Sequence, residues 1–211
     1  MPEIEKLHVL NQPLSRQKVA VLRNEDTGLP DFRRVMRELS MLLVGEAASK
    51  LPTRTARIRT PLQETEVQKI SAPVCLVPVL RAGLGMLDGA LALLPTATVG
   101  FMGLQRDEET AEPVEYYVNL PQNLEDYFVI VLDPMLATGG SLSATLAKLK
   151  EHGATGISCI HAVAAEPGVG RVTSEHPDVD FYIAAVDPEL DDNAFIVPGL
   201  GDAGDRLYGT L

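Results

Sequence analysis

The strongest constraint on the fold is an apolar run that stops at an acid and a proline and leads, through a glycine-rich loop, into a helical pattern. Phe128–Leu132 is β-branched and apolar, which is typical of a buried parallel strand. Asp133 and Pro134 end this strand, because proline cannot donate to the ladder of a central strand. The pattern then predicts a helix over 141–152 that ends at Gly153.

The loop between strand and helix has the chemistry of a phosphate site. Residues 138–141 (Thr-Gly-Gly-Ser) lie where a helix begins, so their backbone N–H groups are unpaired and face the positive end of the helix dipole. The glycines let an anion approach the main chain, and the hydroxyls of Thr138 and Ser141 add two donors. The same four residues also suit an ordinary turn, and they match neither the Walker nor the dinucleotide-binding pattern. We interpret them as a phosphate cradle.

Composition restricts the class of protein. A chain of 211 residues with 45% hydrophobic residues predicts a single globular domain over 1–211. Lys and Arg number 18 against 29 Asp and Glu, a net charge of −11, which disfavours binding to nucleic acid or to a membrane surface. Cys75 and Cys159 lie in apolar runs and are expected to be buried free thiols. The first ten residues are charged and lack an apolar segment, so we expect a cytoplasmic protein.

The first third of the chain predicts mainly helix. Residues 1–29 are expected to form an N-terminal arm with a short helix. A longer helix should begin with Asp31 as its N-cap and end before Pro52, because apolar residues recur there at helical spacing. Residues 56–62 alternate like an edge strand, and 64–69 give no clear pattern.

A second strand–loop–helix unit lies in the middle of the chain. The apolar run 74–80 predicts a buried strand, and it is followed by Arg81 and glycines, a helix over 84–94 and a strand over 97–102. This order is typical of a parallel sheet with right-handed crossovers. Ligands of such sheets bind beyond the carboxyl ends of the strands, where Arg81 and Asp133 are both expected.

The remaining segments complete an α/β pattern. Residues 103–121 predict a hairpin flap with Arg106 at its polar turn, where by residue type alone a solvated charge is the simpler interpretation. Strands are expected over 157–165 and 179–186, joined by a crossover helix over 166–176. The four histidines are scattered without catalytic partners, so each is assigned a structural role.

The C-terminal segment, about 187–211, has an unusual spacing. Gly199, Gly201 and Gly204 alternate with larger residues in a pattern that predicts neither helix nor strand and exposes main-chain groups. The apolar residues Phe195, Ile196, Val197 and Leu200 argue against disorder.

Taken together, these segments resemble the uracil phosphoribosyltransferase family of type I phosphoribosyltransferases. The resemblance lies in 80–86 (Leu-Arg-Ala-Gly-Leu-Gly-Met), 133–141 (Asp-Pro-Met-Leu-Ala-Thr-Gly-Gly-Ser), 198–206 (Pro-Gly-Leu-Gly-Asp-Ala-Gly-Asp-Arg) and 106–110 (Arg-Asp-Glu-Glu-Thr). It implies a parallel sheet flanked by helices, a β-hairpin flap and a C-terminal hood over the base. It also implies the conversion of uracil and 5-phospho-α-D-ribose 1-diphosphate (PRPP) to UMP and diphosphate, a step of pyrimidine salvage.

The resemblance further implies roles for individual residues. Arg81 and Arg106 would bind PRPP through its diphosphate, and Asp202 would face both uracil and PRPP or its metal, which makes Arg106 and Asp202 the candidate catalytic residues. The loop for the ribose and the 5-phosphate would comprise Asp133, Pro134, Met135, Leu136, Ala137, Thr138, Gly139, Gly140 and Ser141. The uracil contacts would be Ile196, Gly201, Asp202 and Ala203. Mg²⁺ is implied as cofactor, bound mainly through PRPP and water with no direct protein ligand. GTP is a candidate effector, and a homodimer or higher homo-oligomer is expected.

Two departures and two rival functions accompany this resemblance. Family members commonly have Tyr where this chain has Phe195, and the order Ala165-Glu166-Pro167-Gly168 differs from Ala-Pro-Glu-Gly, which puts the start of the crossover helix in doubt. One rival is a PRPP-binding regulator of pyrimidine genes that acts through RNA, which the acidic charge disfavours. The other is a transferase for a purine or for orotate, whose carboxylate would need a cation near the base, where the tail offers only Arg206.

Overall fold

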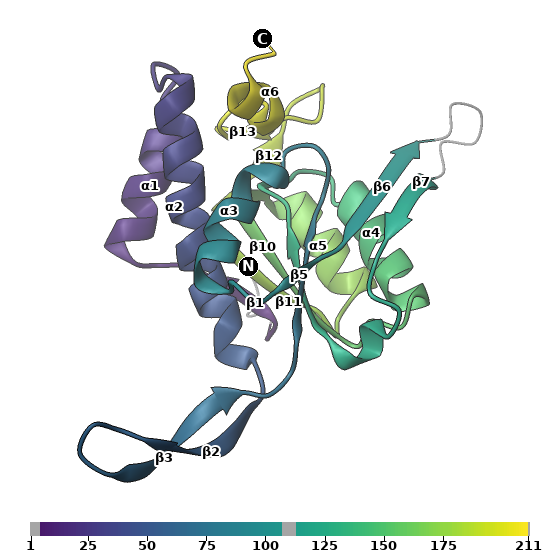
Figure 1. Ribbon diagram of the computed structural model, residues 1–211. Coiled ribbons are helices and arrows are strands. Elements are labelled where there is room, and N and C mark those ends of the chain that lie inside the picture. Colours follow the sequence, from purple (N-terminus) through teal and green to yellow (C-terminus); the bar gives the residue numbers. More distant parts are fainter. Residues whose placement is uncertain (1–4, 107–112, 211) are drawn as a thin grey trace.

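A computed structural model of the chain describes residues 5–106 and 113–210, and the side chains of 104–116 lie outside the described part. Its centre is a seven-stranded parallel sheet in the order β1-β11-β10-β8-β4-β5, with β9 paired to β10 (Figure 1). The strands are β1 (Leu7–Val9), β4 (Val74–Pro78), β5 (Thr98–Val99), β8 (Phe128–Leu132), β9 (Met135–Leu136), β10 (Gly156–Ala165) and β11 (Asp180–Asp187). The predicted α/β class is confirmed.

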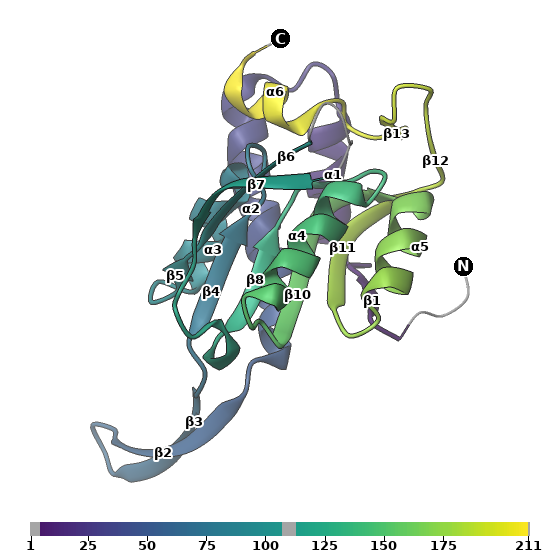
Figure 2. The same cartoon turned by 90° about the vertical axis from the view of Figure 1, so that its right-hand side faces the viewer.

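Helices cover both faces of the sheet, so two apolar cores form. One face carries α1 (Pro13–Arg23), α2 (Leu29–Ala47) and α3 (Leu84–Leu93), and the other carries α4 (Gly140–Glu151) and α5 (Glu166–Glu175) (Figure 2). Along β8, Ile130 and Leu132 belong to the first core, while Val129 and Val131 belong to the second. Burial on both faces explains why this strand is apolar throughout rather than alternating. Cys75 and Cys159 are buried free thiols, as expected.

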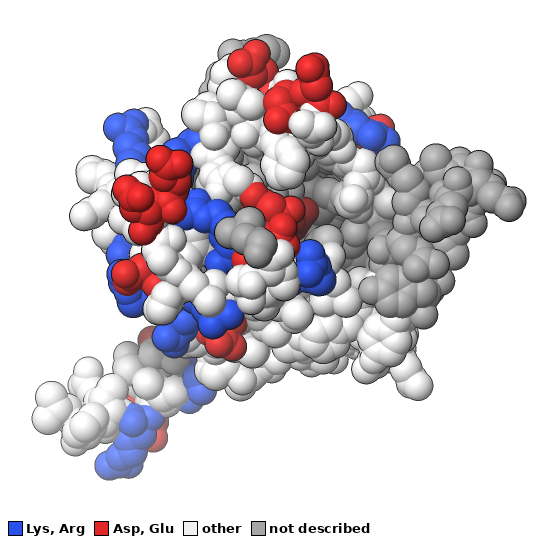
Figure 3. All heavy atoms as spheres, turned by 90° about the horizontal axis from the view of Figure 1, so that it is seen from above, with Lys and Arg blue, Asp and Glu red and all other residues white. Residues whose placement is uncertain are grey.

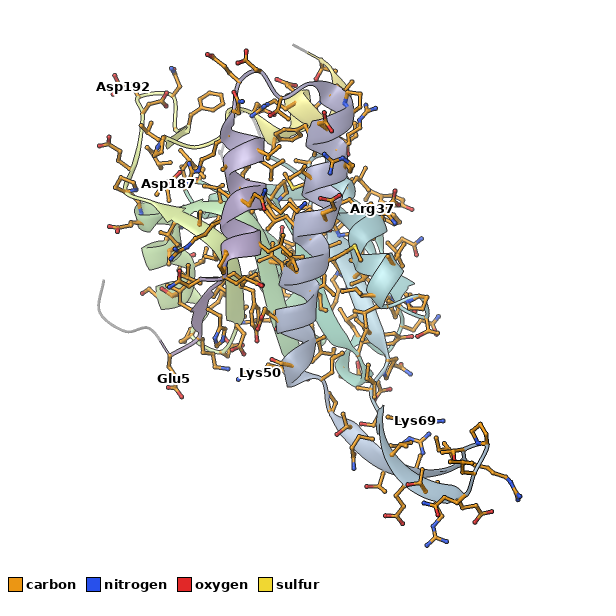
Figure 4. All side chains as sticks on the ribbon, turned by 90° about the vertical axis from the view of Figure 1, so that its left-hand side faces the viewer. Glu5, Arg37, Lys50, Lys69, Asp187 and Asp192 are labelled. Carbon is orange, nitrogen blue, oxygen red and sulfur yellow. The ribbon has the colours of Figure 1, made fainter. Side chains whose placement is uncertain are left out.

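The N-terminal third differs from the prediction in two places. The arm contains β1, which pairs in parallel with β11 and extends the sheet, in addition to the expected short helix α1. Helix α2 begins at Leu29 with Gly28 as its N-cap, so the assignment of Asp31 as the cap is wrong. Pro30 suits the first turn of a helix, and Asp31 lies within that turn, where its charge favours the helix dipole. Figure 4 shows α1 and α2 side by side across the sheet.

Two hairpins leave the main body. Strands β2 (Thr53–Arg59) and β3 (Glu64–Ile70) form a separate antiparallel pair that projects from the foot of the molecule (Figures 1 and 4). The strand predicted over 56–62 is present as β2 but lies three residues earlier, at 53–59, and its partner is the segment 64–70, where no clear pattern is visible in the sequence. The predicted flap is confirmed as the hairpin β6 (Phe101–Arg106) and β7 (Pro113–Asn119), whose expected tip lies outside the described residues.

The C-terminal segment is more regular than its sequence suggests. It forms the short antiparallel pair β12 (Glu189–Leu190) and β13 (Ile196–Val197), followed by α6 (Ala203–Tyr208). Helix α6 is capped by Asp202, whose Oδ1 accepts a hydrogen bond from the Asp205 N–H at 2.9 Å. The prediction of neither helix nor strand is therefore wrong for these residues, although Gly199 and Gly201 do adopt positive φ. The 3₁₀ turns Ala48–Lys50 and Leu124–Asp126 complete the described structure.

Candidate active site

The loops after β4 and β8 meet at the carboxyl end of the sheet. The Val79 N–H donates to the Leu132 carbonyl at 2.9 Å, and the Gly83 N–H donates to the Val79 carbonyl at 2.8 Å. A Cβ on Gly83 would lie 2.2 Å from the Leu132 carbonyl oxygen, so only glycine permits this packing. The loop that carries Arg81 is thereby held directly against the strand that leads into Asp133, as the sequence predicted.

The loop that we interpret as a phosphate cradle turns directly into α4. Gly139 is the N-cap residue, in the left-handed region with φ 77°, and α4 begins at Gly140, one residue earlier than expected. Before the cradle, Met135–Leu136 pairs with β10, and the Pro134 carbonyl accepts hydrogen bonds from the N–H groups of Ala162 and Val163. The expected continuous loop is thus interrupted by a short strand, which anchors the cradle to the sheet.

Helix α5 packs tightly on this loop. A Cβ on Gly168 would lie 2.0 Å from the Ala137 carbonyl oxygen, so the helix and the loop are in backbone contact at this glycine. Helix α5 begins at Glu166 with Pro167 in its first turn, a position that proline favours. The order Glu166-Pro167 therefore starts a regular crossover helix.

Arg171 of α5 lies beside the cradle, a residue that the sequence analysis did not select. A Cβ on Gly140 would lie 3.2 Å from Arg171 Nη1, so the guanidinium flanks the first residue of α4. Arg171 stands about thirty residues after the cradle and outside every segment that carries the family resemblance. No pattern in the sequence could have found it, because only the packing of α5 on the loop brings it there.

Asp133 is half-buried at the end of β8, and burial raises the pKa of its carboxyl to about 7. A weak hydrogen bond from the Met135 N–H, at 3.4 Å, opposes this shift. His161 Nδ1–H donates to the Asp133 carbonyl at 2.7 Å, and burial lowers the pKa of His161 to about 4, so its imidazole is neutral. This contact agrees with the structural role predicted for His161, because the imidazole holds the turn that begins the loop 133–141, which the family resemblance implies is the PRPP loop.

A cavity of about 220 Å³ joins the segments that the resemblance connects. It is lined by residues from three parts of the chain: Ala82 after β4; Met135 and Ala137 in the PRPP loop; and Ala194, Phe195, Ile196, Gly201, Asp202, Ala203 and Gly204 in the tail. All four residues expected to contact uracil line it. Phe195, where the resemblance led us to expect Tyr, lines the cavity with a side chain that is 46% exposed.

The tail is fixed over the cavity by two arginines. Arg23 of α1 forms a bidentate ion pair with buried Asp187, with N–O distances of 2.6 and 2.7 Å, and also donates to the Gly199 carbonyl at 2.8 Å. Arg206 donates to the carbonyls of Leu22, Leu200 and Asn24, and its guanidinium lies 4.3 Å from the centre of the Phe32 ring. The N-terminal helices therefore hold the C-terminal tail in place beside the cavity, and no pattern in the sequence indicated this contribution.

The predicted charged residues Arg81, Asp202 and Arg106 differ in how close they lie to the cavity. The Arg81 side chain is exposed, with its Nη2 3.7 Å from Asp205 Oδ1, and its carbonyl accepts a hydrogen bond from the Tyr208 hydroxyl. Asp202 lines the cavity while capping α6. Arg106 ends β6, but its side chain lies outside the described part, so its predicted contact with diphosphate stays a prediction.

Within the described residues, no three His, Cys, Asp or Glu side chains are grouped so that they could hold a metal ion. Asp202 caps α6 and Asp205 lies 3.7 Å from Arg81, so their carboxylates could contact the water ligands of a Mg²⁺ that arrives bound to phosphate, since Mg²⁺ usually keeps several waters. None of the helices in the described part is long and apolar enough to span a bilayer.

The parallel sheet is covered by helices on both faces, and it carries a glycine-rich loop after a central strand, a hairpin beside that loop and a C-terminal segment over the carboxyl ends of the strands. This arrangement is the fold of the type I phosphoribosyltransferases. The hypoxanthine phosphoribosyltransferase of Staphylococcus aureus shares this fold, with a TM-score of 0.51 over 75% of this chain and 76% of its own, at 13% identity. More specifically, the sequence profile of uracil phosphoribosyltransferase matches residues 9–210, and the chain belongs to that family.

Similar proteins cover nearly the whole chain. The uracil phosphoribosyltransferase of Alkaliphilus oremlandii is 49% identical over 208 residues, which are 98% of this chain and 100% of the relative. The relative from Streptococcus salivarius, with the same name, is 47% identical over 97% of this chain and 99% of its own. The structure of the AQ2163 protein from Aquifex aeolicus superposes with a TM-score of 0.88 at 39% identity, covering 96% and 97% of the two chains.

Proposed function

We propose that this chain transfers the phosphoribosyl group of PRPP to uracil, forming UMP and releasing diphosphate. The observation that carries the proposal is the 220 Å³ cavity, which is lined both by residues of the loop 133–141 and by residues of the glycine-rich tail. An apolar cavity with a few main-chain polar groups suits a flat base, and the cradle beside it suits a phosphate. The base and the sugar phosphate would therefore meet where the two segments face each other.

Uracil would be read by main-chain groups of the tail. The Asp191 N–H donates to the Phe195 carbonyl at 2.9 Å, directly beside the Leu190–Ile196 pair of the β12–β13 ladder. Positions with and without cross-strand hydrogen bonds alternate in an antiparallel ladder, so we infer that the N–H and C=O of Ile196 turn away from β12. Together with the N–H groups of Gly201 and Ala203, they supply the donors and acceptors that the O4, N3–H and O2 edge of uracil requires.

The chemistry would rest on positioning and electrostatics. The transition state should resemble a ribosyl oxocarbenium ion with departing diphosphate, which favours bidentate cations at the leaving group and fixed geometry at the ribose. Arg81 and Arg106 would bind the diphosphate, Asp133 and the loop that follows it would hold the ribose and 5-phosphate, and Asp202 would face PRPP. Mg²⁺, bound through PRPP and water, would supply further charge neutralisation of the diphosphate.

The structure disfavours both rival functions. Arg206, the cation that an orotate carboxylate would need, is engaged with three carbonyls and the Phe32 ring, and the described residues that line the cavity include no Lys or Arg. Seen from the hood, the described acidic and basic side chains are interspersed and do not form a basic stripe for RNA (Figure 3).

The test is formation of UMP from labelled uracil and PRPP, with and without Mg²⁺. Uracil should react and cytosine, hypoxanthine and orotate should not; release of diphosphate without UMP, or preference for another base, would refute the proposal. Salt-sensitive RNA binding without turnover would instead support the regulator.

Three accompanying proposals concern the environment of the enzyme. We infer a homo-oligomer, supported by the projecting β2–β3 hairpin, on which Leu62 is 94% exposed and Ile70 49% exposed. A cytoplasmic location is the expectation stated from the sequence, and activation by GTP is what the family resemblance implies. Sedimentation of the purified protein tests the first, fractionation of expressing cells the second, and the UMP assay with added GTP the third.

A further inference from the structure

Arg171 is a cation placed at the proposed 5-phosphate site by a helix that carries no part of the family pattern. Its Nη1 flanks Gly140, at the start of α4, where the unpaired backbone N–H groups of the cradle begin. Its position depends on the close approach of α5 to the loop at Gly168, described above. The guanidinium is therefore set by backbone packing, although the side chain itself is 48% exposed.

A hydrogen-bonded network orients the guanidinium. Arg171 Nε donates to Glu175 Oε1 at 2.9 Å. This hydrogen bond uses Nε of the guanidinium, while Nη1 lies beside the cradle. The other oxygen of Glu175 accepts a hydrogen bond from the Ser143 hydroxyl, which lies in the first turns of α4. Contacts from Ser143 and Arg171 lower the pKa of Glu175, so its carboxylate stays charged and holds the arginine.

We propose that Arg171 is a further ligand of the 5-phosphate of PRPP. This inference rests on the proposed function. A phosphate monoester carries a charge close to −2 at neutral pH, while the helix terminus supplies only about half a positive charge. In a chain of net charge −11, a guanidinium beside the cradle would supply the missing charge and directed N–H donors. The alternative is that Arg171 forms only a surface ion pair with Glu175 and has no part in substrate binding, since such pairs contribute little.

The experiment separates the two phosphate ends of PRPP. Ribose 5-phosphate and diphosphate are used as probes by calorimetry and as inhibitors of UMP formation. The Arg171→Gln variant should bind ribose 5-phosphate about 10- to 100-fold more weakly, the scale of one hydrogen bond between charged groups, and should raise KM for PRPP with little change in KM for uracil. Its affinity for diphosphate should change less than twofold, and Arg171→Lys should recover part of the loss.

Arg34 provides a matched control. It forms the same i,i+4 ion pair on α2, with Glu38 at 2.9 Å, and is 55% exposed, but it belongs to neither substrate site. Arg34→Gln should leave both affinities unchanged. This inference would be overturned if Arg171→Gln bound ribose 5-phosphate within twofold of wild type. It would also be overturned if the variant lost affinity equally for ribose 5-phosphate and for diphosphate. Absence of UMP formation by the wild type would instead overturn the proposed function.

Discussion

The contact between α5 and the PRPP loop can be tested by two substitutions in one helix. Gly168 and Gly170 lie two residues apart in α5, but their surroundings differ completely. A Cβ on Gly168 would lie 2.0 Å from the Ala137 carbonyl oxygen and 3.1 Å from that of Leu136, whereas a Cβ on Gly170 would have no atom within 4 Å. The same substitution, glycine to alanine, therefore creates a steric clash at residue 168 and none at residue 170.

The expected magnitudes follow from these distances. A carbon and an oxygen atom need roughly 3.3 Å, so Gly168→Ala must move the loop and helix apart by about 1 Å, and overpacking of this kind costs about 1–3 kcal/mol. Gly170→Ala meets no obstacle and should stabilise α5 by up to about 1 kcal/mol, because alanine is the better helix former. The free energies of unfolding of the two variants should thus differ by about 2–4 kcal/mol, equivalent to a difference in Tm on the order of 10 °C.

The expected effect on activity is larger, because the displaced loop is the one that we propose holds the ribose 5-phosphate. A misplacement of about 1 Å can cost about 100-fold in rate, so kcat/KM for PRPP should fall by that order in Gly168→Ala and stay unchanged in Gly170→Ala. Thermal unfolding and initial rates of UMP formation measure both quantities. Equal Tm values and equal kcat/KM values for the two variants would show that the contact has no role in shaping the site.

Four further predictions concern the substrate site. Gly140→Val should fold with a nearly unchanged melting curve, because the three atoms nearest its Cβ all belong to side chains, the first being Arg171 Nη1 at 3.2 Å, yet it should lose PRPP binding in calorimetry. Arg106→Ala should lower kcat/KM for PRPP by about two decades or more and spare the use of uracil; unchanged PRPP kinetics would return this residue to a solvated turn charge. Wild type, Ile196→Val and Asp202→Asn should all reject cytosine by roughly 10⁴–10⁵-fold, with Asp202→Asn slower overall, and efficient cytosine use by any of them would refute readout by the backbone. The pKa of Asp133 is raised from 3.8 to about 7, so the native state binds the extra proton and this stabilising contribution is lost as pH rises from about 4 to 7. Relative to wild type, the free energy of unfolding of Asp133→Asn should therefore increase with pH across that window, by at most about 1.4 kcal/mol per pH unit, and a pH-independent difference in denaturant titrations would contradict the assignment.

Local sequence determined most of the sheet and the course of the PRPP loop. The strands β4, β8, β10 and β11 are buried on both faces, and continuous apolar runs of that kind are visible without any tertiary information. Gly139 at the start of α4 was equally visible, because the backbone there adopts a positive φ that favours glycine. The resemblance of four short segments to one family then connected residues more than a hundred positions apart, and residues of three of these segments line one cavity.

Other features depended on partners distant in the chain. The polar strand β3 forms only because β2 pairs with it, and β1 is too short to be recognised without β11 beside it. The tail acquires its shape because Arg23 and Arg206 bind its carbonyls, and neither arginine lies in a pattern that predicts this. Such contacts leave no periodic trace in the sequence.

The sequence by itself therefore indicated which chain segments are expected to bind phosphate and base, because those segments need particular residues in their own backbone. Only the tertiary structure decided which side chains from elsewhere lie beside them. Arg171 reaches the cradle through the packing of α5 at Gly168, and His161 supports the turn at Asp133 from a neighbouring strand. The physical reason is that a glycine turn is a local requirement, whereas a cation beside it can come from any helix that the sheet brings close.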